Sequence, residues 1–409
     1  MKVAIVHDYL YQFGGAEKCV ESWLKLYPQA DIYASFSIPE KFTSSELITE
    51  KFQQKKVFNS KMQWLFKPKF MLKFQKHLFF LYPIFMSFWT IKNYDLVIIS
   101  ATFCGKNVKF KNCHKIVYYC YTPTRFLHGF ITETDQKTIP LFLRKMIPIF
   151  TFWLKIMDLK AVRYLKKNHT KWLTISNYIQ TITKKAYKVN SEVVYPPVEI
   201  DRFLALKREP VLTVNKGAKE NYQEPFYLYY GRISFHKRVD LVIQACLELN
   251  KKLLIAGQAA FAPELVKLKE IIAQYETKDP SKKGLVKFLG RVPDDERDEL
   301  LRKTKAFIFP VKEDFGIVSI ESFATGTPLI AYKAGGALEY VKEGVNGVFF
   351  EKQGVESLKK AILEFEKVPF KGQSGVYSSN QKFWDDEKIR ETSKPFAEEK
   401  FLEFFKNQV

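Results

Sequence analysis

Short apolar runs alternate with longer amphipathic segments along most of this chain. The alternation is most regular in the second half, where the predicted strands are residues 226–231, 252–256, 285–289, 305–310, 328–332 and 347–350. Strands that alternate with helices favour a parallel sheet covered by helices on both faces. This half therefore predicts a doubly wound α/β domain.

The first half repeats the alternation less regularly. Its predicted strands are residues 2–7, 31–36, 94–100, 115–119, 172–175 and 192–195. A helix is expected behind Ser176, a good N-cap residue, and should run to Tyr187. Residues 141–167 also indicate a helix, with an expected break near Pro148 because proline lacks the backbone N–H. These features predict a second α/β domain.

A proline pair, Pro196 and Pro197, marks the boundary between the halves. We expect an N-terminal Rossmann-like domain over residues 1–196 and a C-terminal one over residues 197–380. Residues 381–409 are rich in Lys, Glu and Phe and are predicted to be helical. A length of 409 residues gives each domain enough chain to bury its own core.

Positive charge is concentrated in the first domain. The net charge is +21, of which residues 1–196 contribute +18. Residues 51–92 contain nine lysines, no acidic residue and eleven aromatic residues from Phe58 to Trp89. This mixture suits an anionic membrane surface, or single-stranded nucleic acid whose bases stack on the rings. Solvated lysines over ordinary core aromatics are a third interpretation; we favour the membrane because charge and aromatics coincide in one domain.

The cysteines and the first residues indicate the compartment. Five cysteines are scattered along the chain without a C-x-x-C pair, which argues against a disulfide framework or a zinc site. The opening M-K-V-A-I-V-H-D contains an apolar run too short for a signal sequence. These features favour a reducing compartment such as the cytoplasm, and no metal site or resident cofactor is expected.

One stretch, residues 307–336, combines the features of an anion site. A buried strand leads through a loop with Glu313 and Gly316 into a helix that carries Glu321 and should end at Gly326. A strand joined to a helix through a glycine loop presents backbone N–H groups and a positive helix end to an anion. Carboxylates on either side accept hydrogen bonds from hydroxyls. The stretch therefore predicts a site for a phosphate flanked by sugars.

Similar features occur at two other places. Gly14 and Gly15 precede an amphipathic helix, although an ordinary turn would also explain them. Arg232 and Lys237 follow the predicted strand at 226–231 at a spacing that lets both reach one anion. A surface pair that caps a helix is the simpler alternative for these two cations.

Six motifs occur in an order that resembles one enzyme family. They are G-G-A-E at 14–17, S-N-Y at 176–178, Y-P-P-V-E-I-D-R-F at 195–203, Y-G-R-I-S-F-H-K-R at 230–238, F-L-G-R-V at 288–292 and E-D-F-G-I-V-S-I-E at 313–321. The ordered set resembles the retaining glycosyltransferases of family 4, which are GT-B enzymes. It is most similar to the mannosyltransferase-type members that build bacterial surface polysaccharides.

The resemblance covers nearly the whole chain and implies a complete architecture. Two Rossmann-like domains would face each other across a cleft, with the acceptor on the first and the nucleotide-sugar donor on the second. The tail helix would pack back onto the first domain.

The family's functional residues carry over to matching positions. Arg232 and Lys237 would supply positive charge to the leaving diphosphate without a metal. Glu313 would hold the donor sugar and Glu321 the ribose hydroxyls. Further contacts with the nucleotide are implied for Gly14, Gly15, Arg291, Val292, Phe315, Gly316, Ile317 and Val318.

One position departs from the family pattern. Related sequences commonly carry a histidine just before T-P-x-R, where this chain has Tyr121. Tyrosine donates a hydrogen bond but does not readily share a proton near pH 7. Arg125 would bind an acceptor phosphate or a donor hydroxyl, and His128 is a candidate replacement, with packing as its simpler role. Same-face attack, in which the leaving phosphate takes the acceptor's proton, would make a protein base dispensable.

The sequence thus predicts a retaining hexosyltransferase held peripherally at the inner face of the cell membrane. Its donor is expected to be GDP- or UDP-linked, most simply GDP-mannose, and its acceptor a lipid-linked or growing glycan. A GT-B nucleotide-sugar epimerase is the main alternative, since it shares the diphosphate site. A nucleic-acid-binding protein would explain the charge but not the spacing of the paired glutamates.

Overall fold

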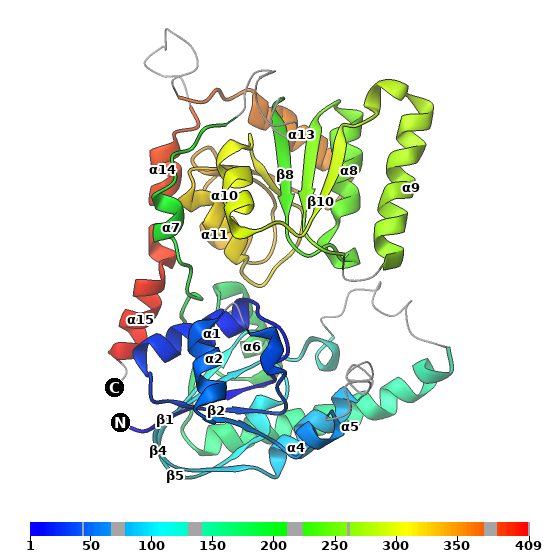
Figure 1. Ribbon diagram of the computed structural model, residues 1–409. Coiled ribbons are helices and arrows are strands. Elements are labelled where there is room, and N and C mark those ends of the chain that lie inside the picture. Colours follow the sequence, from blue (N-terminus) through cyan, green and yellow to red (C-terminus); the bar gives the residue numbers. More distant parts are fainter. Residues whose placement is uncertain are drawn as a thin grey trace. The chain divides into compact units, whose positions relative to one another are not determined.

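Two separate parallel sheets organise the chain (Figure 1). The computed structural model describes residues 1–42, 45–66, 78–129, 141–210, 224–259, 262–371 and 383–407. Residues Met1–Pro197 and Glu398–Val409 form one compact unit, here unit 1, and Val198–Ala397 form unit 2.

Within the described residues, the sheet of unit 1 has seven strands in the order β3-β2-β1-β4-β5-β6-β7, and every pairing is parallel. The strands are β1 (Val3–His7), β2 (Asp31–Ala34), β3 (Val57–Asn59), β4 (Thr90–Ala101), β5 (Lys109–Cys120), β6 (Lys171–Thr174) and β7 (Glu192–Val193). Six of them confirm the predicted strands. β3 was not predicted because its three residues lie in the basic aromatic stretch and are only partly buried.

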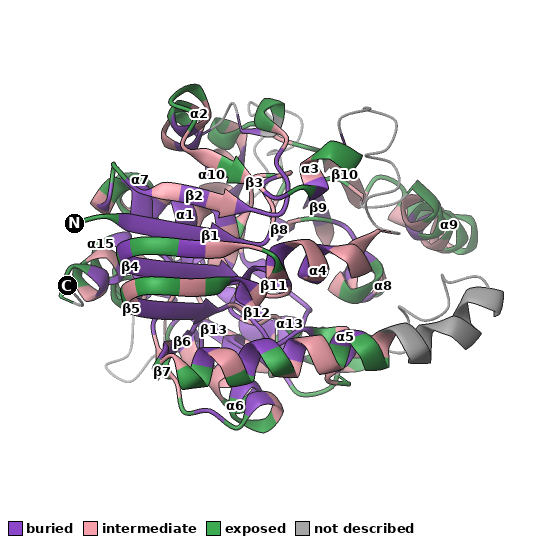
Figure 2. Cartoon of the chain, turned by 90° about the horizontal axis from the view of Figure 1, so that it is seen from below, coloured by how far each residue is buried: buried purple, intermediate pink, exposed green. Residues whose placement is uncertain are grey.

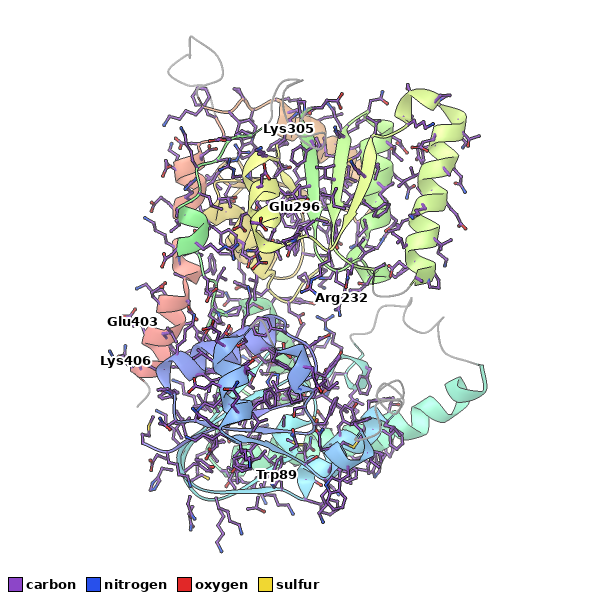
Figure 3. The ribbon with its side chains drawn as sticks, in the orientation of Figure 1. Trp89, Arg232, Glu296, Lys305, Glu403 and Lys406 are labelled. Atoms are coloured by element: carbon purple, nitrogen blue, oxygen red, sulfur yellow. The ribbon has the colours of Figure 1, made fainter. Side chains whose placement is uncertain are left out.

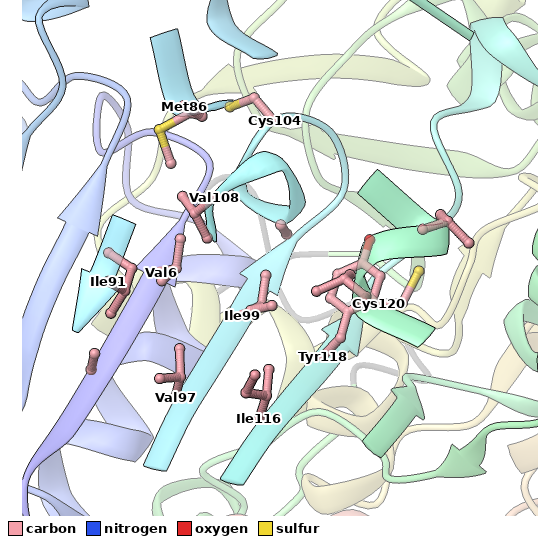
Figure 4. Close-up of a cluster of buried hydrophobic side chains, with 14 of the residues drawn as sticks. Val6, Met86, Ile91, Val97, Ile99, Cys104, Val108, Ile116, Tyr118 and Cys120 are labelled. Atoms are coloured by element: carbon pink, nitrogen blue, oxygen red, sulfur yellow. The ribbon is translucent and has the colours of Figure 1, made fainter. Parts of the chain in front are cut away.

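The core of unit 1 forms around the central strands β1, β4 and β5. Alternate residues of a strand point to the same face, and Val97 and Ile99 of β4 accordingly join Val6 of β1 and Ile116 of β5 in one buried cluster (Figure 4). β1 is buried along its whole length, and β4 and β5 are buried in their carboxyl-terminal parts (Figure 2). Their apolar runs explain why the sequence located them well.

The helices of unit 1 are α1 (Gly15–Leu26), α2 (Glu46–Gln53), α3 (Met62–Leu65), α4 (Tyr82–Ser87), α5 (Leu141–Lys167), α6 (Asn177–Tyr187) and α15 (Glu398–Lys406). The predicted start of α6 is confirmed, since Ser176 Oγ accepts a hydrogen bond from Ile179 N at 3.1 Å. The predicted break near Pro148 is wrong, because α5 is continuous. A proline removes a single intrahelical hydrogen bond, and the well-packed C-terminal part of α5 outweighs that loss.

The tail is divided between the two units instead of forming one helix. α14 (Asp386–Glu391) packs on α11 (Ile317–Ala324) within unit 2. α15 lies against α1, where Glu398 accepts hydrogen bonds from Ser22 Oγ at 2.5 Å and Lys25 Nζ at 2.7 Å. The expected boundary at residues 380 and 381 lies outside the described residues.

Unit 2 contains a parallel sheet whose described strands follow the order β10-β9-β8-β11-β12-β13. The strands are β8 (Phe226–Tyr230), β9 (Lys252–Ala256), β10 (Val286–Gly290), β11 (Phe307–Phe309), β12 (Leu329–Tyr332) and β13 (Gly347–Phe350). The remaining helices of four or more residues are α7 (Asp201–Leu204), α8 (Val239–Glu248), α9 (Ala262–Lys278), α10 (Asp294–Lys303), α12 (Ala337–Tyr340) and α13 (Val355–Glu366). All six predicted strands are confirmed, as is the doubly wound α/β class of both halves.

In both sheets, the order of the strands reverses at an equivalent position. In unit 1 the chain order changes between β1 and β4, and in unit 2 it changes between β8 and β11. In open α/β sheets, ligands bind beyond the carboxyl ends of the strands at such a switch point. Functional residues are therefore expected near these two switch points.

Candidate functional site

At the switch point of unit 2, two oppositely charged side chains meet. Lys237 ends the short 3₁₀ helix after β8, and Glu313 lies in the loop after β11. Lys237 Nζ and a Glu313 carboxylate oxygen form an ion pair, and the two side chains keep 20% and 24% of their surface exposed. A cation and a carboxylate thus lie side by side at the switch point, where ligands bind in open α/β sheets.

Arg232 lies at the end of the same strand. It follows Gly231 directly after β8 and is exposed, and its carbonyl accepts a hydrogen bond from Tyr229 Oη at 3.1 Å. Figure 3 shows Arg232 at the carboxyl ends of the strands and Lys305, which precedes β11, at the opposite end of the sheet. The predicted cation pair is therefore on the edge where ligands bind.

Glycines close the ends of three neighbouring strands. Gly231, Gly257 and Gly290 follow or end β8, β9 and β10, all with positive φ. Gly257 N donates to Gly290 O at 2.7 Å, and a Cβ on Gly257 would lie 1.8 Å from Gly231 O. The strand ends therefore pack backbone to backbone, which only glycine permits at Gly257.

A second glycine pair fixes the loop of Glu313. Gly336 N donates to Glu313 O at 2.9 Å, and a Cβ on Gly335 would lie 2.3 Å from that same oxygen. Tyr340 Oη donates to Phe315 O at 2.8 Å. The backbone that carries Glu313 is thus held from the neighbouring loop, which keeps the carboxylate in place.

The start of α11 requires its glycine. Gly316 has φ of +104°, and a Cβ there would lie 2.6 Å from Tyr340 Oη. Ile317 and Val318 follow as the first residues of the helix and are half-buried, whereas the Phe315 side chain is buried against Tyr340. The backbone N–H groups at a helix start carry partial positive charge, so this end of α11 faces the switch point with the polarity an anion needs.

Glu321 lies deeper than the other predicted site residues. It is buried in α11, and it acts on Arg297 of α10: burial alone would lower the pKa of Arg297, but the Glu321 carboxylate raises it. Arg297 also pairs with Asp298 at 2.9 Å. The carboxylate of Glu321 thus has a cation beside it that the sequence did not suggest, since Arg297 stands in an ordinary charged helix.

Arg291 and Val292 follow β10, the edge strand of the sheet. Arg291 is exposed and Val292 is half-buried. Both belong to the same carboxyl edge as Arg232, two strands away. Their predicted position beside a nucleobase stays a prediction.

At the switch point of unit 1, a chain of polar groups runs inward from Tyr121. Tyr121 Oη lies 2.8 Å from Ser100 Oγ and 3.1 Å from Ala16 O. Ser100 Oγ lies 2.9 Å from His7 Nδ1, and His7 Nε2 lies 3.5 Å from Glu17 Oε1. Burial raises the pKa of Tyr121 well above its usual value, so its hydroxyl stays neutral and donates a hydrogen bond.

The glycine pair in unit 1 lies at the start of α1. Gly14 is the N-cap residue, with extended backbone, and Gly15 is the first helical residue. Tyr121 Oη reaches the carbonyl of the next residue, Ala16. The helix start is thus tied to the end of β5, where Tyr121 lies.

A buried ion cluster lies behind the loop that carries Arg125. Lys106 Nζ, fully buried, lies 2.6 Å from Asp158 Oδ1 of α5 and 3.0 Å from Thr124 Oγ1. His128 Nε2 lies 3.0 Å from Asp158 Oδ2. Arg125 itself is exposed. The structure therefore separates two residues that the sequence grouped: Arg125 is open to solvent, while His128 is an internal partner of Asp158.

The charges in this cluster depend on each other. Burial alone would raise the pKa of Asp158, but Lys106 and His128 hold it below the usual value. Burial would likewise lower the pKa of Lys106, but Asp158 raises it above the usual value. Both groups are therefore ionised near neutral pH, and the cluster fixes the loop from Thr124 to His128.

Sequence reasoning missed His7, Glu17, Lys106 and Asp158. A signal was present for one of them, because Asp158 is the only acidic residue between positions 136 and 191. A single acidic residue in a long basic segment indicates a specific partner, and in the structure that partner is the buried Lys106. Lys106 gave no such signal, since lysine is common throughout this domain.

Within the described part of the chain, no three His, Cys, Asp or Glu side chains form a group able to hold a metal ion. No described helix is long and apolar enough to cross a membrane. Independence from metals stays a prediction.

Fold and sequence comparisons agree on the class of architecture. Over 100% of the chain, the fold is similar to the crystal structure of Anabaena Alr3699/HepE in complex with UDP, with a TM-score of 0.64, 18% identity and 99% of that chain covered. The structure of WaaG, a glycosyltransferase involved in lipopolysaccharide biosynthesis, gives a TM-score of 0.59 at 13% identity, with 100% of this chain and 99% of that one covered. At such identities the likeness concerns the fold alone, which is GT-B.

A family model matches part of unit 2. Residues 214–379 match the family model of glycosyl transferases group 1. An uncharacterized glycosyltransferase of Methanocaldococcus jannaschii is 27% identical over 54% of this chain and 58% of its own length. The O-antigen chain mannosyltransferase RfbU of Salmonella typhimurium is 27% identical over 58% of this chain and 65% of its own length. The chain thus spans less than two thirds of either relative.

Proposed function

We propose that the protein is a retaining glycosyltransferase that moves a hexose from a nucleotide sugar to a glycan acceptor. The observation that carries this proposal is the ion pair of Lys237 and Glu313 at the switch point of unit 2. It lies on the carboxyl edge that also carries Arg232, next to the start of α11. This arrangement offers cations and helix N–H groups to a diphosphate and a carboxylate to a sugar.

Each predicted site residue takes a role in this proposal. Arg232, Lys237 and the backbone from Phe315 to Val318 bind the diphosphate. Glu313 binds the sugar hydroxyls and Glu321 the ribose. Arg291 and Val292 lie beside the base. Gly14 and Gly15 contact the nucleotide, and Tyr121 acts near the reaction centre. The acceptor side is formed by Arg125 and by His128, which acts through Asp158.

The reaction breaks the bond between the sugar C1 and the diphosphate oxygen and forms a bond from C1 to an acceptor oxygen on the same face. The leaving diphosphate takes the proton of the acceptor hydroxyl, so the products are a glycoside and a protonated nucleoside diphosphate. Arg232 and Lys237 stabilise the charge that develops on the leaving group. No protein base is required, which agrees with a neutral Tyr121.

We propose mannose as the sugar and GDP-mannose as the donor. The support is the name of a relative, the O-antigen chain mannosyltransferase of Salmonella typhimurium. UDP-linked donors are the alternative, because a protein of similar fold was crystallised with UDP-glucose. Both donors present the same diphosphate and ribose to unit 2, so the choice concerns only the base and the sugar.

The proposed acceptor is a lipid-linked or growing glycan, and the proposed location is the cytoplasmic face of the membrane. The structure divides the aromatics of residues 51–92: Phe58, Trp64 and Phe88 are exposed, whereas Phe66 and Tyr82 are core residues. Lys51 is buried and donates to Pro28 O. Part of this stretch, residues 67–77, lies outside the described residues.

Incubation with GDP-mannose, UDP-glucose and related donors, with analysis of released nucleotide and sugar products, tests the proposal. We expect turnover of one donor, and its loss in Glu313→Gln but not in the control Glu343→Gln, an exposed acid of the same unit. If no donor is consumed and GDP-mannose and UDP-glucose bind Glu313→Gln as tightly as the parent, the proposal fails.

An epimerase with the same site is the second candidate. It would convert its nucleotide sugar without any acceptor, so the same product analysis distinguishes the two activities. Nucleic-acid binding is not proposed, since the Lys237–Glu313 pair and its glycine frame would have no use in it.

A further inference from the structure

The long helix α5 has two chemically different faces. Along residues 151–167, its buried positions are Leu154, Asp158, Ala161, Val162 and Leu165. Its exposed positions are Phe152, Trp153, Lys155, Lys160, Arg163, Lys166 and Lys167. At 100° per residue these two sets fall on opposite sides of the helix, and Figure 2 shows exposed and buried positions alternating along α5.

The exposed face of this segment carries positive charge without compensation. It holds five cations and no acid, because Asp158 is on the buried face and pairs there with Lys106 at 2.6 Å. Several exposed cations of unit 2 have acids beside them, such as Lys333 with Glu351 at 2.6 Å. A face of this kind attracts a surface with many negative charges.

Exposed aromatic side chains gather on the same unit. Phe152 and Trp153 of α5 are 68% and 40% exposed, and Phe88, which follows α4, is 79% exposed. α4 and α5 both pack against the short helix Gly105–Asn107, and Figures 1 and 2 both show α4 beside α5. In the described part of unit 2, Phe235 is the only exposed Phe or Trp.

We propose that the exposed face of α5, with Phe152 and Trp153, docks the protein on an anionic lipid surface. The cations would lie against the headgroups while the two rings enter the headgroup layer, as basic amphipathic helices with aromatic residues do. The inference makes α5, in place of residues 51–92, the main docking element. It rests on the proposed function only in that a lipid-linked acceptor gives the docking a purpose.

The two faces of α5 connect docking to the acceptor loop. Asp158 on the buried face binds Lys106 and His128, and Lys106 binds Thr124, the residue before Arg125. A helix that lies on the membrane therefore also holds the loop that would meet a lipid-linked acceptor. The positive face of α5 is complementary in charge to anionic phospholipid headgroups. Binding to another polyanion, such as an oligonucleotide, is tested as an alternative outcome.

Flotation of the purified full chain with vesicles tests the charged face. We expect binding to vesicles of phosphatidylcholine and phosphatidylglycerol in equal parts, and none to phosphatidylcholine alone. The triple variant Lys155→Glu, Lys160→Glu, Arg163→Glu should bind at least about tenfold more weakly, because each cation near the surface contributes to attraction. The matched control reverses three exposed lysines of α9 in unit 2, Lys267→Glu, Lys269→Glu and Lys278→Glu, and should float like the parent.

A second pair of variants tests the aromatic residues. Phe152→Ser with Trp153→Ser should weaken flotation at least about threefold, since the rings enter the headgroup layer. Val266→Ser with Leu363→Ser removes exposed apolar side chains of unit 2 and should change nothing. All substituted side chains are exposed, so circular dichroism should show a folded protein in each case.

Three outcomes would overturn the inference. The first is an equal loss of flotation in the α5 variant and the α9 control. The second is full flotation of the α5 variant together with loss in the triple variant Lys55→Glu, Lys61→Glu, Lys92→Glu. The third is binding of the parent protein to uncharged vesicles as strong as to anionic ones. Retention by an oligonucleotide column with no binding to either vesicle also rejects it. Flotation needs no nucleotide sugar, so its failure is distinct from failure of the proposed function, which donor turnover in detergent measures.

Discussion

The two sheets share the same type of strand order, but the charged side chains near their switch points differ in burial. In unit 1, His7, Glu17, Lys106 and Asp158 are all less than 5% exposed and form two pairs, His7 with Glu17 and Lys106 with Asp158. In unit 2, Lys237 and Glu313 form their pair near the surface, and Arg232 is exposed. The same topology thus supports an internal frame that fixes loops in one unit and an open set of charges for a ligand in the other.

Breaking the internal frame should give the largest effect. Asp158→Ala leaves Lys106 buried without its carboxylate and should lower the free energy of unfolding by about 3–5 kcal/mol. Urea unfolding followed by circular dichroism measures this loss. The open pair in unit 2 should show no comparable sensitivity.

A double-mutant cycle provides the control for that result. Lys106→Met alone should also destabilise, and Lys106→Met with Asp158→Ala should cost clearly less than the sum of the single changes. Additive losses would show that the two side chains act separately, which would contradict the description of one cluster.

Breaking the open pair should instead affect activity. Lys237→Ala is expected to lower kcat/KM for the donor by about 10²–10³-fold, because one preorganised cation at the leaving group is lost. Its unfolding midpoint should stay near that of the parent, since such surface pairs contribute only about 0–1 kcal/mol.

Lys333→Ala serves as the matched control, because it breaks the exposed pair with Glu351 in the same unit. That variant should keep both activity and stability. The opposite result, in which Lys237→Ala is strongly destabilised but its folded fraction keeps full activity, would show that this pair stabilises the fold and does not serve a ligand.

The glycine frame of unit 2 should respond to a single methyl group. A Cβ on Gly257 would lie 1.8 Å from Gly231 O, whereas a Cβ on Gly284 would meet nothing within 4 Å. Both residues have positive φ, so each Gly→Ala change carries backbone strain. Gly257→Ala should cost about 1–3 kcal/mol more than Gly284→Ala because of the clash, as thermal unfolding would show. Equal losses would mean that the strand ends adapt freely.

The regular parts of the fold were predictable for simple reasons. The strands of unit 2 are short, apolar and bounded by turns, and a parallel sheet buries such runs on both faces. β3 was missed because Val57–Asn59 is brief and only partly buried. The break at Pro148 was wrong because a local preference gave way to the packing of the rest of α5.

The site was predictable only where its residues are close in sequence. Glu313, Gly316 and Glu321 belong to one loop and helix, so their spacing was informative. Arg297 next to Glu321, and Lys106 next to Asp158, come from distant segments that only the fold brings together. No local pattern distinguishes such residues from ordinary surface charges.

Acid should weaken the ion pair of Asp158 and Lys106. Because the folded protein holds the pKa of Asp158 below the usual value of about 3.9, this group contributes stability that is complete above that pH. The contribution is lost as the pH falls through the pKa of the folded protein, where the carboxylate takes up a proton and its attraction to Lys106 ends. The difference in unfolding free energy between the parent and Asp158→Asn should therefore be constant near neutral pH and shrink below about pH 4. A difference that is independent of pH would show that Asp158 is not ionised in the folded state.

The smallest expected effect comes from relieving backbone strain at two residues, one of which lies beside Lys237 of the proposed site. Lys188 in unit 1 and Arg238 in unit 2 both have left-handed backbone at a helix end, with φ of +54° and +53°. Lys188 is exposed at the end of α6, so Lys188→Gly should raise the free energy of unfolding by about 0.5–1 kcal/mol. Arg238 follows Lys237 and binds Asp240 through Nη2 at 3.1 Å, so Arg238→Gly loses that contact while it relieves the strain. Thermal unfolding should therefore show a gain for Lys188→Gly and little or none for Arg238→Gly; equal gains would mean that the Arg238 side chain does nothing to hold the backbone beside Lys237.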